Sequence, residues 1–225
     1  MSSIFVAGLD LGQTSDYSAL VIVQAKGTSQ TLETNEPIPK QIYVETMPLV
    51  QLDIGHVERF PLGTAWQTIA DRMAARCARM KAPRYLAIDK TGVGSAPCEM
   101  MEALSPVRIT ITGGDQVMRV SDQEYRVPKR DLVSVPQVAL QNHVLRIGKS
   151  VPFADLLIRE LLAFRFKISL SGHDTYEAWR EAEHDDLVLA LSIASWVAQT
   201  VISMQAVGIM EAATVRPFES QISPY

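Results

Sequence analysis

The chain opens with two apolar runs separated by a short polar turn, and this pattern constrains the fold more than any other feature. Ile4–Asp10 reads as a buried strand that ends in a carboxylate, and Ala19–Ala25 is a second run of the same kind. The segment between them, Leu11–Ser18, is polar and contains a glycine. Two β-rich runs joined in this way predict a hairpin within a sheet.

Predicted strands and helices alternate through the rest of the chain. Further strands are expected at Gln41–Met47, Tyr85–Asp89 and Val107–Ile111, and as a hairpin of Phe166–Leu170 with Thr175–Trp179. Apolar residues at helical spacing predict helices at Thr64–Met80, Ala96–Leu104, Lys129–Val144, Pro152–Phe164 and Asp185–Met204. We expect Pro136 to break the third of these helices, and Pro48–Phe60 to be irregular.

This order of elements predicts an α/β fold, a mixed β-sheet flanked by helices. We expect one domain over residues 1–206, followed by a tail or partner-docking segment over residues 207–225.

Composition excludes several classes of protein. With 47% hydrophobic and 20% charged residues, the chain is not a disordered protein, a collagen-like fibre or a coiled coil. A net charge of −4 argues against binding nucleic acid through bulk charge, although a local basic face is allowed. The two cysteines, Cys77 and Cys98, form neither a disulfide framework nor a CxxC zinc motif.

No membrane association is expected. The first residues lack the basic and apolar regions of a signal peptide. The longest apolar stretch, Leu187–Met204, is interrupted by serine, threonine and glutamine, which favours a buried core helix over a membrane span. We therefore expect a cytoplasmic protein.

Acidic residues occupy three positions where chemistry commonly occurs in α/β proteins. Asp10 and Asp89 each end a predicted strand, and Asp185 and Asp186 open the last predicted helix. Each has an ordinary explanation alone, because aspartates favour turns and acids in a first helical turn gain about 0.3–1 kcal/mol from the helix dipole. In an α/β sheet, however, strand ends and helix termini converge on the binding site.

Carboxylates that converge in this way need a positive partner. Hard oxygen ligands favour Mg²⁺ or Mn²⁺ over zinc. Two such ions about 4 Å apart can activate water and stabilise the leaving oxygen in phosphodiester cleavage.

Three motifs together resemble the C-terminal nuclease domain of phage large terminase subunits. They are GLDLGQTSDYSALVIV around Asp10, YLAIDKTGVGSA around Asp89 and EHDDLVLALSIASW around Asp185. The resemblance extends from about Ile4 to Ala206 and depends on the three motifs occurring in this order.

The resemblance implies a ribonuclease H-like fold and an endonuclease that cuts concatemeric double-stranded DNA during genome packaging. Asp10, Asp89 and Asp185 match the family's ligands for two Mg²⁺ or Mn²⁺ ions, with Asp10 shared by both. Asp186 would belong to the metal site as an alternate or indirect ligand, because adjacent helical residues point about 100° apart. Asp16 and Tyr17 match a DYS element that follows the first strand.

Basic residues near these motifs are candidate DNA contacts. In the family, a segment after the fifth strand lies close to the catalytic face, and here that region contains Tyr125 among several arginines. The candidates for phosphate contact are Lys90, Arg126, Lys129 and Arg130. The ordinary alternative is a solvated loop and helix start. Without visible base-reading residues, cleavage is expected to be largely independent of sequence.

The chain departs from the family in one respect, and alternatives stay open. Large terminases also have a packaging ATPase, but this chain has no GxxxxGK[ST] motif. We therefore expect an excised domain or a stand-alone protein that relies on a separate packaging ATPase, a small terminase or a portal. The main alternative is a non-catalytic DNA-binding or assembly module. Weaker alternatives are a junction resolvase, which shares the fold, and an actin-like or sugar-kinase-type ATPase, which GLDLGQT resembles.

Overall fold

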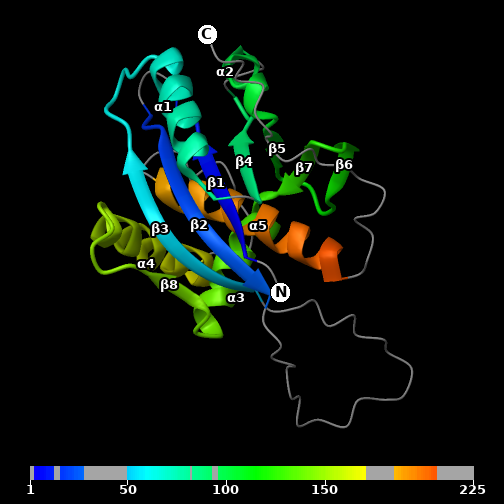
Figure 1. Ribbon diagram of the computed structural model, residues 1–225. Helices are drawn as coiled ribbons and strands as arrows, with labels where there is room; N and C mark the ends of the chain where they lie inside the picture. Colours follow the sequence, from blue (N-terminus) through cyan, green and yellow to red (C-terminus); the bar gives the residue numbers. More distant parts are fainter. Residues whose placement is uncertain are drawn as a thin grey trace, which may run out of the picture.

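One mixed sheet forms the centre of the molecule. The computed structural model describes residues 3–12, 16–27, 50–81, 83–92, 96–170 and 185–206, without the side chains of 165–170 and 205–206. Its eight strands lie in the order β6-β7-β5-β4-β1-β2-β3-β8 (Figure 1). They are β1 (Ile4–Asp10), β2 (Ala19–Gly27), β3 (Val50–Arg59), β4 (Arg84–Asp89), β5 (Val107–Thr112), β6 (Met118–Ser121), β7 (Glu124–Pro128) and β8 (Leu145–Ile147). The predicted α/β class is confirmed.

β1 lies inside the sheet, antiparallel to β2 and parallel to β4. The antiparallel β1–β2 pairing confirms the predicted hairpin. Ile4 and Val6 belong to the core on one face of the sheet, and Ala7 and Leu9 belong to the core on the other. Because both faces are covered, the strand is apolar at successive positions until Asp10.

Helices cover both faces of the sheet (Figure 1). On the face that holds Ile4 lie the helices α3 (Lys129–Gln141), α4 (Ala154–Leu170) and α5 (Asp186–Ala206). The opposite face is covered by α1 (Trp66–Arg79), α2 (Ala96–Met100) and the short 3-10 helix η1 (Glu102–Leu104). We call these the α5 face and the α1 face.

α5 is the core helix of the α5 face and lies directly on β1. A Cβ atom added to Gly8 would come within 2.1 Å of the carbonyl oxygen of Ala190 in α5. A side chain at this position would therefore force the helix away from the strand. The stretch Asp186–Met204 is long and apolar enough to cross a membrane by length and composition, but 67% of it is buried inside the protein. Its apolarity is explained by the core, as the sequence predicted.

Strands are present in two regions where none was predicted. Residues Pro48–Phe60 were expected to be irregular, but β3 covers most of them. Its apolar residues all face α5, polar ones alternate with them, and a bulge interrupts the alternation. β6 and β7 form an antiparallel hairpin in a segment for which no strand was predicted. β6 is only four residues long, and all four are exposed. The strand predicted at Gln41–Met47 lies outside the described residues.

Two predictions about helices are also wrong. α3 continues through Pro136 without a break. Pro136 and its neighbours Leu132 and Val133 are buried, and we attribute the intact helix to this packing, which offsets the hydrogen bond that proline removes. Phe166–Leu170, expected as a strand, forms the last turns of α4. Its predicted partner Thr175–Trp179 and the predicted tail 207–225 lie outside the described residues, so the domain boundary at residue 206 stays a prediction.

Candidate functional site

Asp10 and Asp89 lie side by side at one edge of the sheet, and we call them the strand-end pair. β1 and β4 are parallel, and the last residue pair in register is Leu9 with Ile88, so the two aspartates follow at the same level. Side chains alternate along a strand, and Gly8 and Ala87 belong to the α5 face. Asp10 and Asp89 therefore also face α5. They are only 8% and 7% exposed.

Burial and like charge disfavour ionisation of the strand-end pair. The pKa of Asp10 is raised well above its usual value, by burial first and then by the charges of Asp89, Asp186 and Asp185. Burial also raises the pKa of Asp89 to about 6, although hydrogen bonds from Thr91 and the charge of Lys129 act in the opposite direction. The amide of Thr91 donates to Asp89 Oδ1 at 2.7 Å. These shifts place the acids Asp10, Asp89, Asp185 and Asp186 in one electrostatic cluster.

Asp185 and Asp186 lie where α5 begins, and we call them the helix-start pair. Each has a cationic side chain as a partner. Lys129, the first residue of α3, places its Nζ 3.1 Å from Asp185 Oδ2. Arg59, the last residue of β3, places its guanidinium 3.1 Å from Asp186 Oδ2. Asp186 is 7% exposed, whereas the side chain of Asp185 is 30% exposed.

Arg59 links three elements around Asp186. In the sheet register, Ala19 of β2 pairs with both Asp10 and Arg59, so Arg59 lies at the same edge as the strand-end pair. Its guanidinium also forms an ion pair with Glu160 of α4 and stacks over the Tyr17 ring at 4.7 Å. Glu160 in turn accepts a hydrogen bond of 3.1 Å from the amide of Leu187 in α5.

Sequence reasoning missed both Arg59 and Glu160. Arg59 ends a strand that was expected to be irregular. Glu160 did give a signal, because it lies between Leu157 and Phe164 at helical spacing, on the buried side of α4. A glutamate on the apolar stripe of an amphipathic helix predicts a buried partner of opposite charge.

The predicted DNA-contact residues have different surroundings. Lys129 belongs to the acid cluster, as described above. Lys90 forms an ion pair of 2.8 Å with Glu124, and Arg130 one of 2.9 Å with Asp115. Arg126 is exposed on β7. The structure thus brings Lys129 to the acids and leaves Arg126 at the surface of the hairpin.

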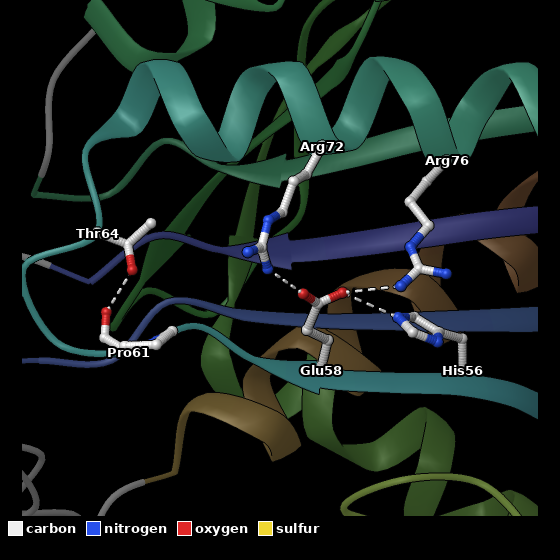
Figure 2. Close-up of polar contacts among 6 residues, drawn as sticks. All are labelled: His56, Glu58, Pro61, Thr64, Arg72 and Arg76. Carbon is white, nitrogen blue, oxygen red and sulfur yellow. Dashed lines mark hydrogen bonds and ion pairs between the residues drawn. The ribbon is translucent and has the colours of Figure 1, made fainter.

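A second charged cluster lies on the α1 face, opposite the site. Figure 2 shows Glu58 of β3 in contact with His56, Arg72 and Arg76, while Thr64 donates to the Pro61 carbonyl nearby at 2.6 Å. Burial acts to raise the pKa of Glu58, but hydrogen bonds from His56 and Arg72 outweigh it and lower the pKa. Glu58 and Arg59 are neighbours in sequence, so alternation directs them to opposite faces.

The acid cluster has the chemistry of a site for Mg²⁺ or Mn²⁺. Its donors are carboxylate oxygens, which these hard cations prefer. A divalent cation would also relieve the repulsion that raises the pKa values of the strand-end pair. In the described part of the chain, no three His, Cys, Asp or Glu side chains are already spaced to enclose a metal ion. The ion pairs of Asp185 with Lys129 and Asp186 with Arg59 fit that observation, since both carboxylates are turned to protein cations.

Comparisons with known proteins bear on the fold. No protein-family model matches the chain, and no curated protein matches it. The chain is similar to the large terminase nuclease from the thermophilic phage G20c, at 18% identity over 86% of this chain and 81% of that chain, with a TM-score of 0.51. It also resembles the human cytomegalovirus terminase nuclease domain, Mn soaked, at 12% identity over 85% and 82% of the two chains, with a TM-score of 0.43.

The likeness to the phage G20c nuclease confirms the predicted ribonuclease H-like fold. At 18% identity it establishes the fold and not the activity.

Proposed function

We propose that this chain is a divalent-metal-dependent DNA endonuclease of the terminase type, which hydrolyses phosphodiester bonds. The observation that supports it most is the gathering of Asp10, Asp89, Asp185 and Asp186 from three separate elements at one edge of the sheet. Three of these carboxylates are less than 10% exposed, which is unfavourable unless a cation joins them. The fold shared with a phage large terminase nuclease adds support.

Asp10, Asp89 and Asp185 would hold two Mg²⁺ or Mn²⁺ ions, with Asp186 beside them. When bound, such ions lower the pKa of a water molecule and neutralise charge on the leaving oxygen. Lys129 holds Asp185 through Oδ2 at 3.1 Å, which is compatible with metal binding through the other carboxylate oxygen. Lys129 would also lie at the edge of the site, where it could bind a phosphate of the substrate.

Double-stranded DNA is the proposed substrate. Lys90 directly follows Asp89, Arg130 directly follows Lys129, and Arg126 lies on the strand that leads to Lys129. Basic side chains at these positions would contact phosphates, which fix orientation but carry no sequence information. We therefore propose largely nonspecific cleavage in a cytoplasmic packaging complex that includes a packaging ATPase, a small terminase or a portal.

One observation favours a second candidate, a non-catalytic DNA-binding or assembly module. Lys129 and Arg59 already form ion pairs with the helix-start pair, which reduces its need for a metal ion. The two candidates differ in whether the acid cluster binds a divalent cation.

Plasmid nicking by the purified chain in Mn²⁺, in Mg²⁺ and in EDTA tests the proposal. We expect conversion of supercoiled plasmid in either metal and none in EDTA, with Asp10→Asn at least about 100-fold slower. Asp53→Asn is the matched control, because Asp53 also lies in a strand of this sheet but forms a partly exposed pair with Lys26. It should cut at the wild-type rate.

Three results would decide against parts of the proposal. Cutting in EDTA, or at full rate by Asp10→Asn, would contradict the metal site. No cutting together with calorimetric Mn²⁺ binding would indicate a nuclease that needs its partner. No cutting and no Mn²⁺ binding would favour the non-catalytic module.

A further inference from the structure

A buried ion-pair triad connects α4, β3 and α5 behind the acid cluster. Arg59 contacts the carboxylates of Glu160 and Asp186, at 3.1 Å for Asp186. All three side chains are 12% exposed or less. The second carboxylate oxygen of Glu160 accepts the hydrogen bond from the Leu187 amide, which lies one residue beyond Asp186. Glu160 therefore contacts both the arginine and the first turn of α5.

The net charge of this triad affects how strongly the acid cluster attracts a cation. An arginine paired with Asp186 alone would cancel the charge that Asp186 adds to the acid cluster. When Glu160 is ionised it supplies a second carboxylate charge, so the triad then retains one net negative charge. Arg59 can then orient Asp186 through a hydrogen bond while the cluster stays attractive to a divalent cation.

We propose that Glu160 and Arg59 form a positioning pair that fixes Asp186 and the start of α5 against β1 and preserves the negative charge of the acid cluster. This inference rests on the proposed function, because it assigns the pair a role toward a divalent cation. Neither residue contacts the substrate in this role. Both act through Asp186 and Leu187.

Glu58 offers a matched control on the same strand as Arg59. It too is a glutamate held by arginines, with a side chain 15% exposed. However, it faces α1, and its partners among the described residues, His56, Arg72 and Arg76, belong to β3 and α1 (Figure 2). A general loss of a buried glutamate charge would affect both positions alike, whereas a positioning role would affect only Glu160.

The test is calorimetric titration of the full chain with Mn²⁺ at pH 8, where Glu160 is ionised because burial raises its pKa only to about 7. Glu160→Gln keeps an oxygen that can accept from Leu187 but removes the charge. We expect it to bind Mn²⁺ about 10- to 100-fold more weakly than the wild type, the usual effect of losing a group that holds a metal ligand. Glu58→Gln should bind within about twofold of the wild type.

The double variant Glu160→Gln with Arg59→Gln distinguishes a positioning role of the two residues from a purely structural one. It restores one net negative charge to the triad and keeps a hydrogen-bond donor beside Asp186. We expect it to recover most of the affinity that Glu160→Gln loses, whereas a purely structural role predicts a further loss. Arg59→Lys, which offers one ammonium for two carboxylates, is the second variant should Glu160→Gln not fold, and weaker binding is expected for it.

The outcomes separate the two proposals. Wild-type affinity in Glu160→Gln, or a double variant weaker than Glu160→Gln, would overturn the positioning pair and leave the proposed function standing. A wild-type chain that binds no Mn²⁺ would overturn both.

Discussion

The strand-end pair and the helix-start pair belong to one cluster, yet the fold treats them differently. Asp185 and Asp186 are each paired with a cation, Lys129 and Arg59. Asp10 and Asp89 interact chiefly with one another and with the Thr91 amide, and their pKa values are raised. The helix dipole favours negative charge at the start of α5, and Lys129 at the start of α3 and Arg59 at the end of β3 lie within reach of these acids. Burial is the first cause of the raised pKa values of the strand-end pair, so an external cation would relieve these two carboxylates most.

A side chain at position 8 would move the helix-start pair away from the strand-end pair. Of the substitutions predicted here, we expect this one to have the largest effect on stability. In Gly8→Ala, the new Cβ collides with the Ala190 carbonyl, so α5 must move away from β1. We expect the free energy of unfolding to fall by about 3 kcal/mol or more, at the upper end of overpacking effects. Urea denaturation measures this loss, and Mn²⁺ affinity should fall with it. Gly55→Ala is the control, because nothing lies within 4 Å of a Cβ there. Equal stability of the two variants would show that α5 does not depend on this contact.

The pH dependence of stability sharpens the comparison, with an expected effect of intermediate size. A raised pKa means that the folded protein binds the proton more tightly than the unfolded chain does. For Asp89, the metal-free protein should therefore lose about 3 kcal/mol of stability as pH rises from about 4 to about 6. Glu160, with a pKa of about 7, extends the loss toward neutral pH.

Asp89→Asn isolates the contribution of one carboxylate. Urea denaturation in EDTA should find this variant more stable than the wild type above pH 6 and equal to it near pH 4. Asp53→Asn, at a partly exposed ion pair, should show no such pH-dependent difference. If Asp89→Asn is less stable than the wild type at pH 7.5, repulsion within the strand-end pair is not the dominant effect.

Removing a cation from the helix-start pair should have the smallest effect. Lys129→Gln leaves Asp185 without its partner, and we expect a loss of about 1 kcal/mol for this partly exposed pair. Because the charge of Lys129 also lowers the pKa of Asp10 and Asp89, the pH at which stability falls should move upward. Lys90→Gln removes an ion pair of similar exposure, with Glu124, and should leave that pH unchanged. Identical pH profiles for both variants would place Lys129 outside the cluster.

The acids could be predicted from the sequence because each belongs to a local pattern. Asp10 and Asp89 follow apolar runs, and Asp185 precedes a long helix, so α/β topology alone implies that they converge. Lys129 was found as a basic residue near a helix start, but its partner Asp185 was not foreseen. Its role as a DNA contact stays a prediction.

Arg59 and Glu160 were missed for a physical reason. The partners of Arg59 are 101 and 127 residues away in sequence, and no local periodicity describes contacts of that range. β3 was missed because a bulge interrupts the alternation of its apolar and polar residues, and β6 because it is only four residues long. Periodicity therefore identified elements with an unbroken pattern and failed where a bulge shifts the pattern or a strand is too short to display one.

The contact of Gly8 with Ala190 joins the first described strand to the last described helix. During synthesis, Asp10 emerges from the ribosome before Asp185 and Asp186, which follow nearly every other described element. Contacts between such distant segments form late in folding. A chain that ends before α5 therefore contains Asp10 and Asp89 but lacks Asp185, Asp186 and the α5 surface that covers the strand-end pair. On the proposed function, a nascent chain would have no complete cutting site until α5 has been translated, so partial products would not cut DNA.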